Sequence, residues 1–146
     1  MSNTPMLKLF ILLIRLVLGM IFIYAGITKV LNPAAFAEDI DNYQMLPYIL
    51  VNVAAIVLPW IEIIAGLLIV FGRYMTVSSF IIIFLNVIFI FAIASAMARG
   101  LDINCGCFSV ADHGSKVGWQ RLVEDFVFLG MAVTVFWDSL RKLKSR

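Results

Sequence analysis

The sequence predicts an all-α, polytopic membrane protein: an antiparallel bundle of four transmembrane helices with a short interfacial helix in the first outer loop. Of the 146 residues, 63% are hydrophobic and only 14% are charged. A soluble domain is nearer half apolar and about a quarter charged. A membrane-spanning helix needs about 20 mostly apolar residues, and four segments reach that length. The length suits a single domain covering residues 1–146.

The four predicted spans cover residues 6–28, 48–71, 76–98 and 117–137. The first apolar run is longer than the core of a cleavable signal peptide, which is about 7–15 residues. We therefore expect it to be retained as a helix. The fourth run is the least apolar, because Arg121, Glu124 and Asp125 crowd its beginning.

Between the first two spans, the sequence predicts a short amphipathic helix on the membrane surface. Asn32 and Pro33 suit the N-cap and the first helical position. Phe36, Ile40 and Tyr43 then recur at helical spacing, and a proline follows shortly after. A solvated connector without this helix is the alternative.

Four spans place both termini on the same side of the membrane. The basic cluster at residues 141–146 follows the last span directly, and positive residues near spans favour the cytoplasm. We therefore expect a bacterial inner-membrane protein with cytoplasmic termini and two long loops facing the periplasm. The net charge of +2 is small and scattered, which argues against binding to nucleic acid.

The only two cysteines lie one residue apart, in the predicted outer loop after the third span. Cys105 and Cys107 flank Gly106, and a disulfide in so small a ring is strained and easily reduced. This pattern favours redox exchange, because a structural disulfide normally closes a long loop. Two alternatives stay open: a thiophilic metal bound by the cysteines with His113, or two cysteines sheltered at a helix end.

Two charged residues lie well inside apolar runs. Arg15 in the first span and Glu62 in the second sit at similar distances from the expected cytoplasmic boundary. Intramembrane charges usually face the bundle interior and pair, so we expect an Arg15–Glu62 ion pair near the midplane. The pair either sets the helix register or borders a cofactor pocket, such as one for a quinone headgroup.

Small residues mark the faces that we expect to meet. On the first span Gly19 and Gly26 share a stripe with Arg15 and Lys29, and on the second Gly66 shares one with Glu62. Small residues allow close approach of helices in lipid.

Polar residues on the last two spans carry further expectations. Arg121 and Asp125 can pair at i,i+4, and Asp125 or Glu124 can take protons during thiol chemistry. Ser79 and Asn86 are expected to form hydrogen bonds across helices.

Several stretches together resemble the DoxX-like superfamily, in particular its MauE (methylamine utilisation) branch. They cover residues 15–29, 32–36, 46–47, 58–66 and 105–108. The resemblance implies a four-helix membrane protein in periplasmic redox or disulfide handling, which for MauE means maturation of a disulfide-rich dehydrogenase subunit. It also implies a link to quinone-coupled sulfur chemistry. The sequence itself contains nothing that points to methylamine.

The leading hypothesis is a membrane thiol–disulfide redox protein that exchanges electrons with a periplasmic thioredoxin-like partner and a quinone. The candidate catalytic residues are Cys105, Cys107 and Asp125, and the candidate quinone-binding residues are Arg15, Lys29, Glu62 and Arg121. A partner would have to supply the second cysteine pair that such a reaction needs. The alternatives are a non-enzymatic scaffold of a redox or maturation complex, and a membrane protein that handles metal through its Cys/His loop.

Overall fold

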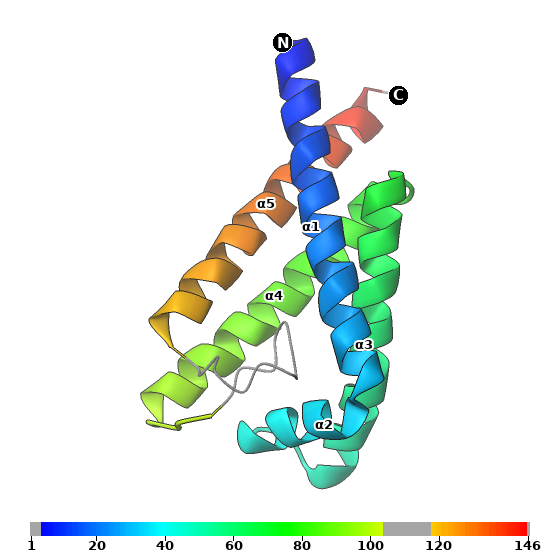
Figure 1. Ribbon diagram of the computed structural model, residues 1–146. Helices are drawn as coiled ribbons and strands as arrows, with labels where there is room; N and C mark the ends of the chain where they lie inside the picture. The colour runs from blue at the N-terminus through cyan, green and yellow to red at the C-terminus, as the bar shows by residue number, and fades with distance from the viewer. Residues whose placement is uncertain (1–3, 104–117, 146) are drawn as a thin grey trace.

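The computed structural model describes residues 4–103 and 118–145, which form five α-helices. They are α1 (Pro5–Leu31), α2 (Pro33–Asn42), α3 (Tyr48–Phe71), α4 (Met75–Ala98) and α5 (Trp119–Lys144) (Figure 1). Cys105, Cys107 and His113 lie outside the described residues. The redox pair and the metal alternative therefore stay predictions.

Three helices in the described ranges, α1, α3 and α4, are long and apolar enough to cross a membrane. They coincide with the first three predicted spans and fit a multi-pass membrane protein. The fourth predicted span overlaps α5, which is 26 residues long and begins at Trp119. Helix α5 is not among the three, because charged residues lie at both of its ends: Arg121, Glu124 and Asp125 at the start, and Asp138, Arg141, Lys142 and Lys144 at the end.

The helices associate as two antiparallel pairs. Helix α1 packs along α3, α4 packs along α5, and α3 also contacts α4. Both chain termini lie at one end of the molecule, whereas α2, the end of α4 and the start of α5 lie at the other (Figure 1). This second end, called the α2 end below, holds the candidate site.

The predicted faces of α1 and α3 do meet, and three glycines bring the two backbones close together. A Cβ atom added to Gly26 would lie 2.7 Å from the Pro59 carbonyl oxygen, and one added to Gly66 would lie 2.7 Å from the Gly19 carbonyl oxygen. No side chain fits at either distance without moving a helix. The small residues therefore set the spacing between α1 and α3.

Helix α2 confirms the predicted short helix. The Asn32 side chain accepts a hydrogen bond from the Ala35 backbone N–H at 3.4 Å, and Pro33 is the first helical residue. Its apolar side faces protein, because buried Phe36 packs with Ala55 of α3. Its position at a membrane surface stays a prediction.

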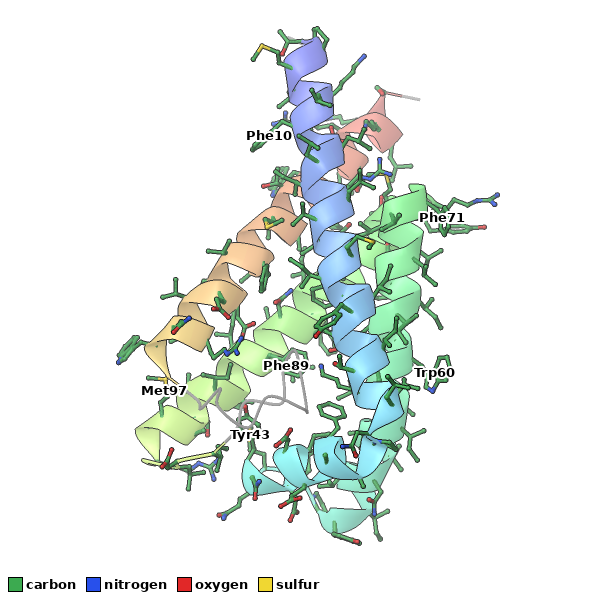
Figure 2. The ribbon with its side chains drawn as sticks, viewed as in Figure 1. Phe10, Tyr43, Trp60, Phe71, Phe89 and Met97 are labelled. Carbon is green, nitrogen blue, oxygen red and sulfur yellow. The ribbon has the colours of Figure 1, made fainter. Side chains whose placement is uncertain are left out.

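Large apolar side chains cover the outside of the helices. Phe10, Trp60 and Phe71 are all more than half exposed, and Figure 2 shows them pointing outward. Inside, the main core brings together residues of four helices, namely Leu18, Phe22, Ala65, Ile69, Ile82, Leu85 and Ala132. An apolar exterior around an apolar core suits a protein that contacts lipid.

At the terminal end, Arg15 corrects one sequence prediction. Its Nε donates to the Ile69 carbonyl oxygen at 3.1 Å and its Nη2 to that of Val70 at 3.3 Å. The predicted Arg15–Glu62 pair is therefore wrong. The prediction assumed that the two helices end at the same level, whereas α1 projects beyond the end of α3 (Figure 1). Arg15 consequently meets the last carbonyls of α3, which a cation stabilises.

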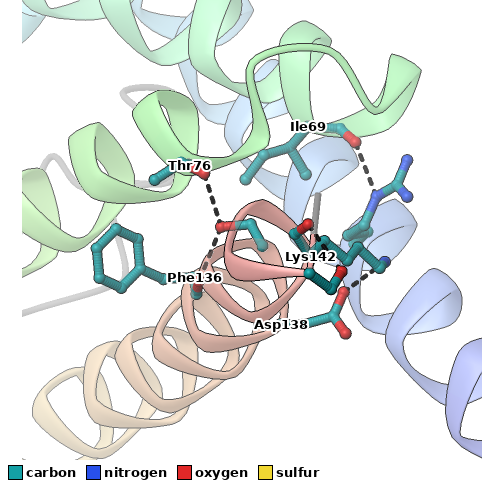
Figure 3. A network of polar contacts seen from close by, with 8 residues as sticks. Ile69, Thr76, Phe136, Asp138 and Lys142 are labelled. Atoms are coloured by element: carbon teal, nitrogen blue, oxygen red, sulfur yellow. Dashed lines mark hydrogen bonds and ion pairs between the residues drawn. The ribbon is translucent and has the colours of Figure 1, made fainter. Parts of the chain in front are cut away.

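Hydrogen bonds at the same end also join α4 to α5. The Thr76 hydroxyl donates to Ser139 Oγ at 3.0 Å, and Ser139 donates to the Phe136 carbonyl oxygen at 2.7 Å (Figure 3). The predicted cross-helix bonds of Ser79 and Asn86 are wrong. Ser79 donates to the Met75 carbonyl and Asn86 to the Ile82 carbonyl, each within α4, because a carbonyl one turn back is always within reach.

We predict that Gly26→Ala lowers the free energy of unfolding by about 1–3 kcal/mol, as overpacking does. The matched control is Gly130→Ala on α5, where an added Cβ meets nothing within 4 Å; it should leave stability unchanged or slightly raised. Thermal unfolding of both variants in detergent measures the difference. Equal stability of the two variants would contradict the close contact.

Candidate functional site

The centre of the α2 end is a buried ion pair between Lys29 on the last turn of α1 and Glu62 in the middle of α3. Lys29 Nζ donates to Glu62 Oε1 at 2.7 Å and to Oε2 at 3.0 Å. The side chains are 0% and 1% exposed. A buried charge is tolerated when it is paired and hydrogen-bonded, and this pairing satisfies both carboxylate oxygens with one ammonium group.

Two aromatic rings complete the surroundings of Lys29. Its Nζ lies 4.9 Å from the centroid of Phe36 on α2 and 5.0 Å from that of Phe89 on α4. The faces of aromatic rings attract a cation, most strongly where water is excluded. One ammonium group is thus contacted by α2, α3 and α4 as well as belonging to α1.

Two more acids interact electrostatically with Lys29. They are Asp39 on α2 and Asp125 on α5, and both side chains are buried. Together with Glu62 they form what we call the buried charged cluster: Lys29, Asp39, Glu62 and Asp125. It contains three carboxyl groups and one amine, contributed by four helices.

The predicted Arg121–Asp125 ion pair is wrong. Arg121 Nη1 instead contacts Glu124 Oε2 at 2.9 Å, three residues along α5, and both side chains are partly exposed. Arg121 stays where its guanidinium keeps some contact with solvent, which avoids the desolvation that a buried partner would require. Asp125 itself is buried on the face of α5 that also buries Ala132 and Val135.

An apolar cavity of about 390 Å³ lies beside the cluster, between α2, α3 and α4. Its walls are almost entirely aliphatic and aromatic, with Asp39 and Tyr43 as its polar side chains. The lining residues are Phe36, Asp39, Ile40, Tyr43, Met45, Leu46, Ala54, Leu58, Val87, Ile88, Phe89, Phe91 and Ala92. The volume lies within the range of about 300–1,000 Å³ typical of small-molecule sites.

Phe36 and Phe89 belong to both features. Each ring forms part of the cavity wall and also contacts the Lys29 ammonium group. Figure 2 shows Phe89 and Tyr43 in the interior between the helices, in contrast to Trp60. The two rings therefore stand between Lys29 and the cavity, whereas Asp39 of the same cluster lines the cavity directly.

Tyr43, directly after α2, is the polar group best suited to donate a hydrogen bond into the cavity. Its burial, and then the negative charge of Asp39, raise the pKa of its phenol well above the ordinary value. The hydroxyl consequently stays protonated at any physiological pH. Arg99 donates a hydrogen bond to the Tyr43 backbone carbonyl, which ties the end of α2 to the end of α4.

The structure brings together three of the predicted site residues and separates two others. Lys29, Glu62 and Asp125 lie in one cluster. Arg15 binds carbonyls at the opposite end of α3, and Arg121 pairs along its own helix. The cysteines lie outside the described residues.

Sequence reasoning missed four residues of the site. Phe36 and Tyr43 appear in the predicted helix pattern, but as a lipid-facing stripe. Asp39 lies beside Ile40 in that helix, and nothing in the sequence marks it as buried, although its side chain is buried in the structure. Phe89 lies in a continuous apolar run, where no local signal distinguishes a ring beside a cation from one facing lipid.

We predict that Lys29→Met and Glu62→Gln each lower the free energy of unfolding by about 3–5 kcal/mol, because each leaves one buried partner uncompensated. Combining Lys29→Met with Glu62→Gln should recover part of that loss, because neither buried charge is then left without its partner. Thermal unfolding of the two single variants and the double variant in detergent tests this prediction. Strictly additive losses would show that the two residues do not interact.

The family match and two similar proteins agree on one family. Residues 7–138 match the family described as methylamine utilisation protein MauE. The chain is 27% identical over 136 residues to the MauE protein of Methylophilus methylotrophus, covering 92% of this chain and 70% of that protein. It is 26% identical over 125 residues to that of Paracoccus denitrificans, covering 84% of this chain and 66% of that protein.

No solved structure matches the chain. The wider resemblance to the DoxX-like superfamily stays an interpretation of the sequence. The family match extends over nearly all of α1 to α5 and includes every residue of the buried charged cluster. The chain belongs to the MauE family.

Proposed function

We propose that this chain is a membrane thiol–disulfide redox protein of methylamine utilisation. It passes electrons between the Cys105–Cys107 pair and a quinone, and a thioredoxin-like periplasmic partner exchanges thiols with that pair during maturation of periplasmic proteins. The link to methylamine utilisation rests on the two relatives, which are both methylamine utilization proteins MauE. The observation that carries the mechanism is an apolar, aromatic cavity beside a buried charged cluster, at the α2 end of the molecule.

The course of the chain supports placing the chemistry at this end. Helix α4 contributes Phe91 and Ala92 to the cavity wall and ends at Ala98. The described chain stops at Ile103 and resumes at Gly118, directly before α5. The cysteines are thus attached to the cavity-forming helix and to the helix that carries Asp125.

The cavity residues fit a quinone headgroup. A quinone is a flat apolar ring with polar oxygens, and the cavity offers aromatic walls from Phe36, Phe89 and Phe91 with a protonated Tyr43 hydroxyl as donor. When bound, a quinone would accept two electrons and two protons. Lys29 and Glu62 lie behind the rings of Phe36 and Phe89, so their role toward this site is electrostatic rather than direct contact. Arg15, at the other end of α3, has no part in it.

The exchange balances with the single cysteine pair of this chain. A dithiol on the partner protein reduces the Cys105–Cys107 disulfide: two partner sulfurs join and two thiols form here. These thiols would then close again to a disulfide, and the two electrons and two protons lost in that step are those that a bound quinone would accept. The second cysteine pair belongs to the partner, because this chain contains two cysteines in all.

The arrangement of the helices supports an inner-membrane topology with α5 as the fourth span. Both termini lie at one end of the molecule (Figure 1), as an even number of crossings requires. Basic residues Arg141, Lys142 and Lys144 occupy the last turn of α5, and such residues mark the cytoplasmic side. The α2 end then faces the periplasm, and α2 lies near that surface.

Thiol trapping in intact cells tests the redox role. A membrane-impermeant maleimide should label both cysteines only after reduction, and Cys105→Ser should abolish oxidation of the partner protein. Labelling only after the cells are lysed would place the cysteines in the cytoplasm and contradict the proposal. If Cys105→Ser supports partner oxidation as well as the native chain does, the protein acts as a non-enzymatic scaffold.

Filling the cavity tests the quinone site separately. We predict that Ala92→Phe, which inserts a ring into the cavity, lowers the rate of quinone reduction by purified protein in vesicles at least tenfold. Ala94→Phe, on the exposed side of the same helix, should leave the rate unchanged and serves as the matched control. Equal rates for the two variants would exclude this cavity as the quinone site.

A further inference from the structure

Asp125 is a buried acid whose setting differs from that of the other acid on its turn. Its side chain is 2% exposed, on the face of α5 that packs against the other helices. The preceding residue, Glu124, is partly exposed and paired with Arg121. Asp125 thus projects into the molecule, toward Lys29 of the buried charged cluster.

A second feature of Asp125 is the incomplete hydrogen bonding of its carboxyl group within residues 4–103 and 118–145. Among the residues that the structure describes, Asp125 Oδ2 is buried and accepts no hydrogen bond. An ionised carboxylate buried in this way is far less favourable than a neutral carboxylic acid, because it has lost its hydration without compensation. The geometry therefore favours the protonated form.

The neighbouring cations are already engaged with other acids. Lys29 on α1 holds both oxygens of Glu62 on α3, and Arg121 contacts Glu124 on α5 itself. Helix α2 contributes the carboxyl group of Asp39, and Tyr43 follows it at the same end. Both cations near Asp125 are thus held by another carboxylate, so neither supplies the hydrogen bond that an ionised Asp125 would need, and a proton on Asp125 removes that need.

We propose that Asp125 is a proton-binding site that holds a proton in the resting protein and exchanges it beside the Lys29–Glu62 pair. Release of the proton leaves a carboxylate that shares the field of Lys29 with Glu62, and uptake restores the neutral acid. The inference does not rest on the redox proposal. If that proposal holds, Asp125 lies at the end of the molecule where thiol oxidation releases protons.

Infrared spectroscopy of the purified protein near neutral pH tests the site. The carbonyl-stretch band of a protonated carboxylic acid should be present, should shift in heavy water, and should disappear in Asp125→Asn. The matched control is Asp138→Asn on the same helix, whose acid pairs with Lys142 at 2.6 Å; it should retain the band. A spectrum without the band, or a band that survives in Asp125→Asn, would overturn the proposal.

Stability supplies a second readout that does not depend on spectroscopy. A neutral Asp125 predicts that Asp125→Asn, nearly identical in shape, leaves the melting temperature within a few degrees of the native value. A fall in melting temperature as large as that caused by Glu62→Gln would show that Asp125 is ionised and paired, and would overturn the proposal. The band should also persist in Cys105→Ser, so that loss of thiol exchange and loss of the proton site are distinguishable.

Discussion

The arrangement of the α2 end depends on enclosing one ammonium group in an apolar interior. Lys29 is fully buried, and a charge in such a place requires a partner, hydrogen bonds and exclusion of competing water. Glu62 supplies the partner, and the rings of Phe36 and Phe89 close the remaining sides. The requirement ties α1 to α3 directly and draws α2 and α4 against them, so four helices are positioned by one side chain.

A second set of constraints acts along the α1–α3 contact. The glycines at positions 19, 26 and 66 allow the backbones to approach until any added side-chain atom would clash. Arg15 binds the last carbonyls of α3 at the far end. The two helices are thus held at both ends by polar contacts and in between by close packing. In an apolar solvent, burial of apolar surface contributes little to the association of helices, so polar contacts and close packing must hold α1 against α3.

The site combines features that are usually separated. The cavity is apolar enough for a lipid-soluble ring, yet its wall is shared with a buried ion pair. Because Phe36 and Phe89 stand between the Lys29–Glu62 pair and the cavity, this pair acts on the cavity through the low-dielectric interior rather than by contact. Tyr43 and Asp39 are the polar groups that reach the cavity itself, and both come from α2 and its end. Helix α2 and the residue directly after it therefore supply the polar groups of the cavity.

The sequence by itself determined the three long apolar helices, the cap and start of α2, and the small-residue faces of α1 and α3, because each follows from composition or spacing within one segment. Tertiary structure decided which charges meet. Arg15 and Lys29 share one face of α1, and hydropathy cannot show which of them stands level with Glu62. The answer depends on how far α1 projects past the end of α3, which is set by packing between the helices. The same holds for Phe89, Asp39 and Asp125, whose roles arise only where segments distant in the chain come together.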